Sequence, residues 1–473
     1  MYPAQQSLIP AQIALARFIE NKGVQAISES YPFWYLGTTP FRFLTGPVIP
    51  FLLAILHKFV FYQVNLFAIF FIVLAIAFPL GAVGVYLLIR ELGGGKRLAV
   101  LTAFFYLLGP IIPFLFPFSN GINLIAFSFL PYALILYKKF ISKNSWKNFI
   151  SCIIAITFII LIDSLIVTPL IVGMGAIIAI TGFKKVEEKI KKLVVLLLIS
   201  LGLVSVWYTP GYWWQVLISP SFAGKPLLSV ISQLGQLLPV ALAIGLAIVS
   251  DNIIRSKNKV FKFGFYWIFI YGFLTFLRFI SDPDFFADWS AYGKELQLGL
   301  AILLSIIVEK AIKKRKIKNF IVLGFAVLYI IFSIYNFKHK LIKTMQTNIV
   351  SSGEYKIGKK LSQIVKPGEK VFLSGSSTFW LNSLFDISQV RGGNDKASVS
   401  KNWRQAAWEI REGDDINRSL KWLQDLKIDY LVIHTNDSLE FYHDYKFPDK
   451  FEKTEKLTKI YDEDGDRIYS LVK

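Results

Sequence analysis

The most constraining feature of this sequence is a series of apolar segments, each close to the length of a membrane-spanning helix, that begins at Asn65. A helix needs about 20 apolar residues to cross the hydrocarbon core of a bilayer. The chain is 54% hydrophobic and only 18% charged, whereas soluble proteins carry about a quarter of charged residues. We therefore expect a mainly α-helical, polytopic transmembrane bundle of about ten spans with a small soluble α/β domain attached. The expected spans cover residues 65–90, 97–117, 121–138, 147–162, 164–183, 192–209, 227–250, 261–280, 293–311 and 318–337.

The loops between these segments alternate in charge. One set is basic, as in 184–192 and 310–318, and the other is neutral, aromatic or acidic, as in 117–121 and 208–225. Basic loops of membrane proteins face the cytoplasm, so the polar tail after the last span is predicted to be extracytoplasmic, as are the residues before 65. The same clustering accounts for the net charge of +20 without a nucleic-acid partner. The sequence thus predicts a multi-pass protein of the plasma membrane.

The first 64 residues are predicted to form an extracytoplasmic region with helices on the membrane surface. Residues 4–22 have the pattern of an amphipathic helix broken at Pro10, and residues 47–62 are too short to span, which favours an interfacial or re-entrant helix. Between them, the proline-rich and aromatic stretch 30–50 is expected to be an ordered loop whose Tyr31 and Trp34 lie at the membrane–water boundary. Because nothing in residues 1–20 would carry this region across a membrane, we expect a first transmembrane helix upstream of Met1. Translocation of a short, nearly uncharged N-terminal tail is the alternative.

The tail has the pattern of a small α/β domain. We expect strands at 370–375 and 428–434, helices at 402–412 and 417–427, and a hairpin formed by 457–461 and 467–472 around the turn at 462–466. The predicted organisation is therefore residues 1–64, an extracytoplasmic loop region; 65–340, a transmembrane helical domain; and 345–473, an extracytoplasmic α/β domain.

Acidic and aromatic side chains at the outer ends of the spans are the candidates for chemistry. Acids within membrane segments, such as Asp163 and Glu295, are costly unless they have a role. They suit a general base or a ligand to a divalent ion, whereas the structural alternative is that such acids only mark water-facing loop tips. The scattered histidines and the single Cys152 predict no His- or Cys-based metal site, and no dinucleotide or phosphate-loop motif is present. Aromatic and acidic candidates for substrate binding are Trp213, Trp214, Asp288 and Trp289.

The segment Trp34-Tyr-Leu-Gly-x-x-Pro-Phe-x-Phe-x-x-x-Pro-x-x-Pro, together with the alternating spans, resembles the GT-C superfamily of membrane glycosyltransferases. The pattern is particularly similar to that of bacterial and archaeal membrane proteins labelled 6-pyruvoyl-tetrahydropterin synthase-related, and Asn120-Gly-Ile-Asn-Leu-Ile-Ala-Phe-Ser-Phe-Leu-Pro131 also looks like that group. The resemblance covers residues 5–340 and implies transfer of a sugar from a polyprenyl-phosphate donor to an envelope glycan, lipid or protein acceptor. Membrane lipids are then partners, and the cofactor is left open, with a divalent cation such as Mg²⁺ or Mn²⁺ among the options.

The resemblance also suggests roles for individual residues. Its members place their catalytic acid in the first outer loop, just after a first transmembrane helix, and no residue here clearly matches that position. Glu29 and Asp163 are the candidate substitutes, with Glu295 as a further catalytic candidate. Trp34, Tyr35 and Arg42 are the candidates for contact with the donor lipid.

Two other classes of function stay open from the sequence. The first is a transporter or flippase for an envelope lipid, although no internal repeat typical of that class is evident. The second is a catalytically inactive membrane scaffold that displays the outer domain.

Overall fold

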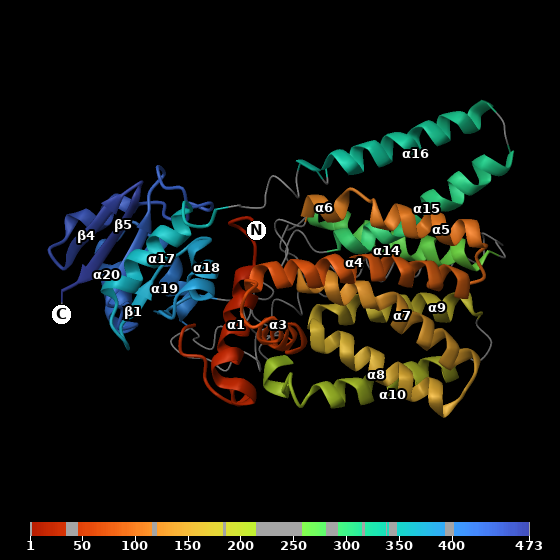
Figure 1. Ribbon diagram of the computed structural model, residues 1–473, viewed down its shortest axis with the longest axis horizontal. Coiled ribbons are helices and arrows are strands. Elements are labelled where there is room, and N and C mark those ends of the chain that lie inside the picture. The colour runs from red at the N-terminus through yellow and green to blue at the C-terminus, as the bar shows by residue number, and fades with distance from the viewer. Residues whose placement is uncertain are drawn as a thin grey trace. The chain divides into compact units, whose positions relative to one another are not determined.

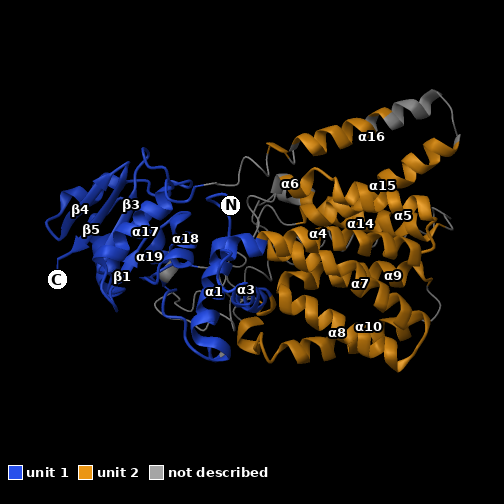
Figure 2. Cartoon of the chain, viewed as in Figure 1, with its two compact units in different colours: residues 1–44, 49–70, 344–473 blue, residues 45–48, 71–343 orange. Residues whose placement is uncertain are grey.

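The computed structural model describes residues 2–34, 46–115, 121–182, 186–213, 258–280, 292–314, 317–336, 338–339, 348–392 and 402–472. The chain forms two compact units (Figure 2). The first, here called the mixed unit, combines residues 1–44, 49–70 and 344–473, and the second, the helical unit, comprises 45–48 and 71–343. The segment expected as an N-terminal region and the one expected as a C-terminal domain therefore share a unit.

The helical unit is built from long apolar helices that run side by side (Figure 1). Every expected span is matched by helix except 227–250, which lies outside the described residues. Pro110 removes a backbone donor where the expected span 97–117 divides into two helices. The elements are α4 (Leu66–Glu91, begun in the mixed unit), α5 (Lys96–Leu107), α6 (Ile111–Leu115), α7 (Ile122–Ser142), α8 (Trp146–Ile162), η3 (Ser164–Ile166), α9 (Val167–Ile180), α10 (Val186–Val204), α14 (Lys259–Ile280), α15 (Gly293–Lys314) and α16 (Ile317–Asn336).

Three stretches of the described chain are long and apolar enough to cross a membrane: Leu66–Glu91, Lys96–Pro113 and Ile122–Ser142. Shorter apolar helices include Val48–Phe59, Trp146–Ile162, Ser164–Ile180 and Ala326–Tyr335. The expected mainly helical architecture with a small sheet is confirmed. The number of spans stays a prediction.

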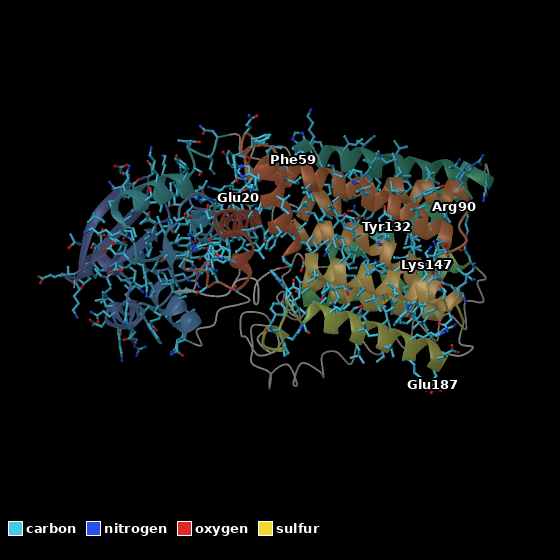
Figure 3. All side chains as sticks on the ribbon, turned by 60° about the horizontal axis from the view of Figure 1, so that its bottom comes forward. Glu20, Phe59, Arg90, Tyr132, Lys147 and Glu187 are labelled. Carbon is cyan, nitrogen blue, oxygen red and sulfur yellow. The ribbon has the colours of Figure 1, made fainter. Side chains whose placement is uncertain are left out.

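The basic loops meet at one end of the helical unit, here called the basic end. Lys138 pairs with the Glu91 carboxylate at 3.2 Å, and Lys192 lies 6.0 Å from the centre of the Phe140 ring. Figure 3 shows Arg90, Lys147 and Glu187 at this same end. These contacts join loops that the charge alternation had assigned to one side of the membrane.

The sheet of the mixed unit has five strands in the order β2-β1-β3-β5-β4. Strand β1 pairs in parallel with β2 and β3, and β5 is antiparallel to β3 and β4. The expected strands β1 and β3, helices α19 and α20, and hairpin β4–β5 are confirmed, whereas α17, α18 and β2 were not predicted. The elements are α17 (Gly353–Ile364), β1 (Lys370–Phe372), α18 (Ser377–Leu384), β2 (Ser388–Gln389), α19 (Trp403–Arg411), α20 (Ile416–Asp425), β3 (Tyr430–His434), η6 (Pro448–Lys453), β4 (Leu457–Glu463) and β5 (Asp466–Leu471).

Alternation along β3 explains how this sheet is covered on both faces. Leu431 and Ile433 lie in one apolar cluster with residues of α19 and α20. Val432 lies in a second cluster with residues of α17 and α18. Successive side chains of a strand point to opposite faces, so a strand that is apolar at every position requires helices on both sides.

The N-terminal helix α1 (Ile9–Lys22) is folded against this sheet domain. Arg17 donates to the Asn382 carbonyl at 3.2 Å and pairs with Asp386 at 3.4 Å, which ties α1 to α18 and the residues after it. The expectation that Pro10 breaks the helix is wrong. Pro10 lies in the first turn, where its missing N–H has no intrahelical partner in any case and its fixed φ suits the start of a helix.

The aromatic residues before position 35 are also covered by protein. Tyr31 and Trp34 are each 1% exposed, and the Phe33 carbonyl accepts a bond from the Gln389 amide at 2.9 Å. Their expected place at the membrane–water boundary is therefore wrong, because strand-like pairing beside β2 draws both rings into the mixed unit. Residues 35–45 lie outside the described chain.

The mixed unit also contains the first turn of α4. Phe67 stacks on Trp380 with ring centres 5.4 Å apart and meets Tyr2 edge-on at 5.1 Å. Helix α3 (Val48–Phe59), short as expected, is tied to α1 by a 2.5 Å contact between His57 and Glu20. The sheet domain thus lies beside the N-terminal end of α4.

Candidate functional site

Asp163 is held rigidly at the junction of α8 and η3, at the end of the helical unit opposite the basic end. Its Oδ1 accepts from the Leu165 amide at 3.0 Å, and its Oδ2 accepts from Asn123 Nδ2 at 2.6 Å. Aspartate suits such a position because its side chain satisfies amides that the new turn leaves unpaired. Asp163 is buried and both of its oxygens are hydrogen-bonded. We call this end of the helical unit, defined by Asn123, Asp163 and Glu295, the carboxylate end.

An aromatic cluster adjoins Asp163. The Ser164 and Tyr212 hydroxyls are 2.6 Å apart, and the Tyr212 ring lies 4.5 Å from Tyr208 and 5.1 Å from Trp213. Burial, together with the charge of Asp163, raises the pKa of Tyr212 despite its bond to Ser164. Tyr212 is therefore a neutral hydroxyl at any ordinary pH, suited to hydrogen bonding.

Glu295 lies in the first turn of α15 and is 2% exposed. Its Oε1 is 2.8 Å from Lys294 Nζ, whereas its Oε2 is buried and has no hydrogen-bond partner among the described residues. The buried Tyr271 hydroxyl likewise has no hydrogen-bond partner in the part of the chain that the structure describes. A buried carboxylate oxygen left unpaired is costly, and such groups are found where a ligand or a reaction uses them.

Gln297, two residues after Glu295 in α15, fixes the position of this helix. Its Oε1 accepts from the Ile112 amide at 2.8 Å and its Nε2 donates to the Tyr106 carbonyl at 2.7 Å. One backbone group on each side of the break between α5 and α6 is thereby satisfied. A Cβ on Gly109 would come within 2.2 Å of the Gln297 side chain, so only glycine fits there.

Helix α7 connects the two carboxylates. Asn123 binds Asp163, and Phe127, one turn later, lies 5.6 Å from Lys294 Nζ across its ring. Residues four apart on a helix share a face, with Cβ atoms about 5–6 Å apart. Asp163 and the Lys294–Glu295 pair therefore lie beside the same face of the first two turns of α7.

The predicted site residues fall into three groups. Asp163, Trp213 and Glu295 are brought together at the carboxylate end. Glu29 and Trp34 belong to the mixed unit, where Glu29 pairs with Lys22 at 2.9 Å and Trp34 is buried. The residues that lie outside the described chain are Tyr35, Arg42, Trp214, Asp288 and Trp289.

Sequence reasoning missed Asn123 and Ser164 as members of this site. Each is a polar residue at the start of an apolar helix or turn. The available signal was closeness in sequence: Asn123 follows the loop 117–121, and Ser164 follows Asp163. The sequence left the cofactor open, with a divalent cation among the options. No group of three or more His, Cys, Asp or Glu side chains in the described ranges could hold a metal ion.

No family model matches this chain, and no curated protein matches it. The resemblance to the 6-pyruvoyl-tetrahydropterin synthase-related group therefore stays a prediction.

Solved structures show the same fold at low sequence identity. The archaeal oligosaccharyltransferase of Archaeoglobus fulgidus, AglB, in the apo form has a TM-score of 0.56 and 15% identity over 100% of this chain and 71% of that chain. Its complex with an inhibitory peptide and a dolichol-phosphate has a TM-score of 0.54 and 15% identity over 91% of this chain and 65% of that chain, so the present chain spans about two thirds of that protein. ArnT from Cupriavidus metallidurans bound to undecaprenyl phosphate has a TM-score of 0.52 and 13% identity over 98% and 93% of the two chains.

The mycobacterial arabinofuranosyltransferase AftD is also similar, with a TM-score of 0.50 and 12% identity over 100% of this chain and 41% of that chain. These neighbours are GT-C glycosyltransferases. The likeness shows that the chain has their fold.

Proposed function

We propose that this protein is a membrane glycosyltransferase of the GT-C type, which transfers a sugar from a polyprenyl-phosphate donor to an envelope glycan, lipid or protein acceptor. The observation that carries the proposal is the buried Oε2 of Glu295, which no described residue hydrogen-bonds, in a helical unit whose fold is shared with three glycosyltransferases. Two of those structures contain a polyprenyl phosphate, dolichol-phosphate in AglB and undecaprenyl phosphate in ArnT. These bound lipids support a polyprenyl phosphate as the carrier of the donor sugar.

The proposed reaction is a displacement at the anomeric carbon of the donor sugar. An acceptor hydroxyl forms the new C–O bond as its proton passes to Glu295 Oε2. The bond between the anomeric carbon and the phosphate oxygen breaks, and its electron pair leaves with the polyprenyl phosphate. A positioned general base increases the rate of such a reaction by roughly 10²–10⁴-fold.

The two carboxylates are suited to different roles. Both oxygens of Asp163 are occupied, by Asn123 and the Leu165 amide, which supports a positioning role. Glu295 has one oxygen bound to Lys294 and one without a hydrogen-bond partner in the described ranges, which supports the role of base. Glu29 is paired with Lys22 in the mixed unit and is a weaker candidate.

We further propose that the carboxylate end and the sheet domain face the extracytoplasmic side. Arg90 lies in the last turn of α4, among the basic loops that favour the cytoplasm. Phe67, in the first turn of the same helix, stacks on Trp380 of the sheet domain. Opposite ends of one spanning helix lie on opposite sides of a membrane.

The experiment that tests the function uses the full chain in lipid nanodiscs with a panel of polyprenyl-phosphate monosaccharides carrying a radiolabelled sugar. Glycosyl transfer predicts that labelled sugar leaves the donor lipid and that free polyprenyl phosphate accumulates. In parallel, the chain is placed in sealed liposomes. Movement of intact labelled lipid between leaflets without cleavage would contradict the proposal in favour of a transporter, and neither cleavage nor movement would favour a scaffold.

A further inference from the structure

The corner between α3 and α4 exposes a group of large apolar side chains. Phe59 is 78% exposed, Phe61 81%, Tyr62 56%, and Ile55, one turn before Phe59 on α3, 62%. We call these four residues the aromatic corner; Phe59 is labelled in Figure 3. Adjacent exposed apolar residues of this size mark an interaction surface more often than a water-facing one.

The backbone of the corner presents the two rings at a conformational cost. Phe61 and Tyr62 have φ of 51° and 62°, the left-handed region that bulky side chains rarely adopt. The turn is closed by bonds from the Phe61 amide to the Lys58 carbonyl and from the Tyr62 amide to the His57 carbonyl, both 3.0 Å. Strained conformations of this kind persist where the surrounding structure fixes them and are often tied to function.

The corner comes immediately before a membrane-spanning helix. Only three residues separate Tyr62 from Leu66, the first residue of α4, and an extended chain covers about 3.3–3.6 Å per residue. The corner therefore cannot lie far from the point where α4 enters the bilayer. Aromatic side chains are enriched at that depth, and the exposed Lys58 beside them is suited to lipid phosphate groups.

We propose that the aromatic corner inserts into the interfacial layer of the bilayer and anchors the mixed unit on the membrane surface. The occupant of this surface is lipid. The inference concerns attachment to the membrane and does not rest on the proposed glycosyl transfer.

The contacts inside the mixed unit transmit this anchoring to the sheet domain. His57 of α3 binds Glu20 of α1 at 2.5 Å, and Arg17 of α1 binds the Asn382 carbonyl at the end of α18 at 3.2 Å. Trp380 of α18 in turn stacks on Phe67 of α4. Because α3 and α4 flank the aromatic corner, the depth to which the corner enters the bilayer sets the distance of the sheet domain from the membrane surface.

The chain allows a clean test, because its single cysteine, Cys152, is buried. In a Cys152→Ala background, a spin label is placed at Phe61→Cys or, separately, at Phe59→Cys. The matched control is Lys456→Cys, an exposed position before β4. Each protein is reconstituted in nanodiscs of phosphatidylcholine and phosphatidylglycerol, and power saturation measures how molecular oxygen and a water-soluble nickel chelate reach the label.

The proposal predicts a severalfold higher oxygen-to-nickel accessibility ratio at positions 59 and 61 than at 456. Equal ratios at the three positions would overturn it, because the corner would then face water. Labels at 59 and 61 shielded from both reagents would also overturn it, in favour of a protein partner. Using two separate corner positions keeps the test valid if one labelled variant fails to fold.

Discussion

Replacing Trp380 tests whether the N-terminal segment and the sheet domain fold as one unit. Trp380 is fully buried; its ring stacks on Phe67 and its Nε1 donates to the Gln5 carbonyl at 3.0 Å. It therefore contacts α4, the N-terminal segment and its own helix α18 at once. Trp380→Ala removes all three contacts and leaves a cavity.

The expected cost follows from that burial. Large-to-small substitution of a buried tryptophan costs about 3–5 kcal/mol. Because roughly 1.4 kcal/mol corresponds to a factor of ten in an equilibrium constant, opening of the mixed unit should increase between about a hundredfold and a few thousandfold. The matched control is Trp408→Ala, since Trp408 on α19 is 51% exposed and its replacement should cost much less.

Amide hydrogen exchange of the full chain in nanodiscs measures the effect by segment. We expect faster exchange in α18 and, to a similar degree, in α1, because Arg17 ties α1 to the residues that follow α18. Wild-type protection in α1 of the Trp380→Ala protein would refute the reasoning. Faster exchange throughout both proteins, including Trp408→Ala, would show a general loss of folding instead.

Three further predictions concern the mixed unit and are checked by its thermal unfolding. Burial alone would lower the pKa of His434, but its bond to Asp466 at 2.7 Å and the charge of that carboxylate raise this pKa above 6.5. The stability that the imidazolium contributes is therefore complete below pH 6.5 and is lost as the pH rises through the raised pKa. His434→Asn should flatten the dependence of the unfolding temperature on pH. Lys450→Met should cost about 1–3 kcal/mol, because the ammonium donates to the Glu409 carbonyl in α19 and to the Gly413 carbonyl just after it; an unchanged midpoint would contradict this. Gly392→Ala should cost about 3 kcal/mol, because φ is +133° and a Cβ would lie 2.1 Å from the Trp34 ring; a neutral result would mean that Trp34 is not seated there.

The succession of helices along the chain could be predicted from the apolar segments and from the charge of the loops between them. Continuous apolar segments specify helices regardless of what surrounds them, and the basic loops identified one end of the bundle correctly. The two-residue strand β2 and helix α18 were missed because residues such as Asn382 and Gln389 are polar yet buried, where they hydrogen-bond to each other. A pattern based on hydrophobicity cannot recognise such segments.

The candidate site was predictable only in part. Asp163 and Glu295 drew attention because acids in apolar segments are costly, and both are buried at one end of the helical unit. Trp34 was misplaced because an aromatic loop next to prolines has the same composition at a membrane surface and inside a domain. Its actual neighbour, Gly392, is more than 350 residues away along the chain, and no local signal reports such a contact.

The central claim, that the carboxylate end performs glycosyl transfer, is tested most directly by comparing two changes on one helix. Glu295→Gln removes the proposed base, whereas Glu309→Gln, further along α15, removes the carboxylate of the ion pair with Lys313 at 3.0 Å. The rate of polyprenyl phosphate release from a labelled donor is measured for both full-length proteins in nanodiscs. The account predicts a loss of about 10²–10⁴-fold for Glu295→Gln and a near wild-type rate for Glu309→Gln. Equal rates in the two variants would contradict it.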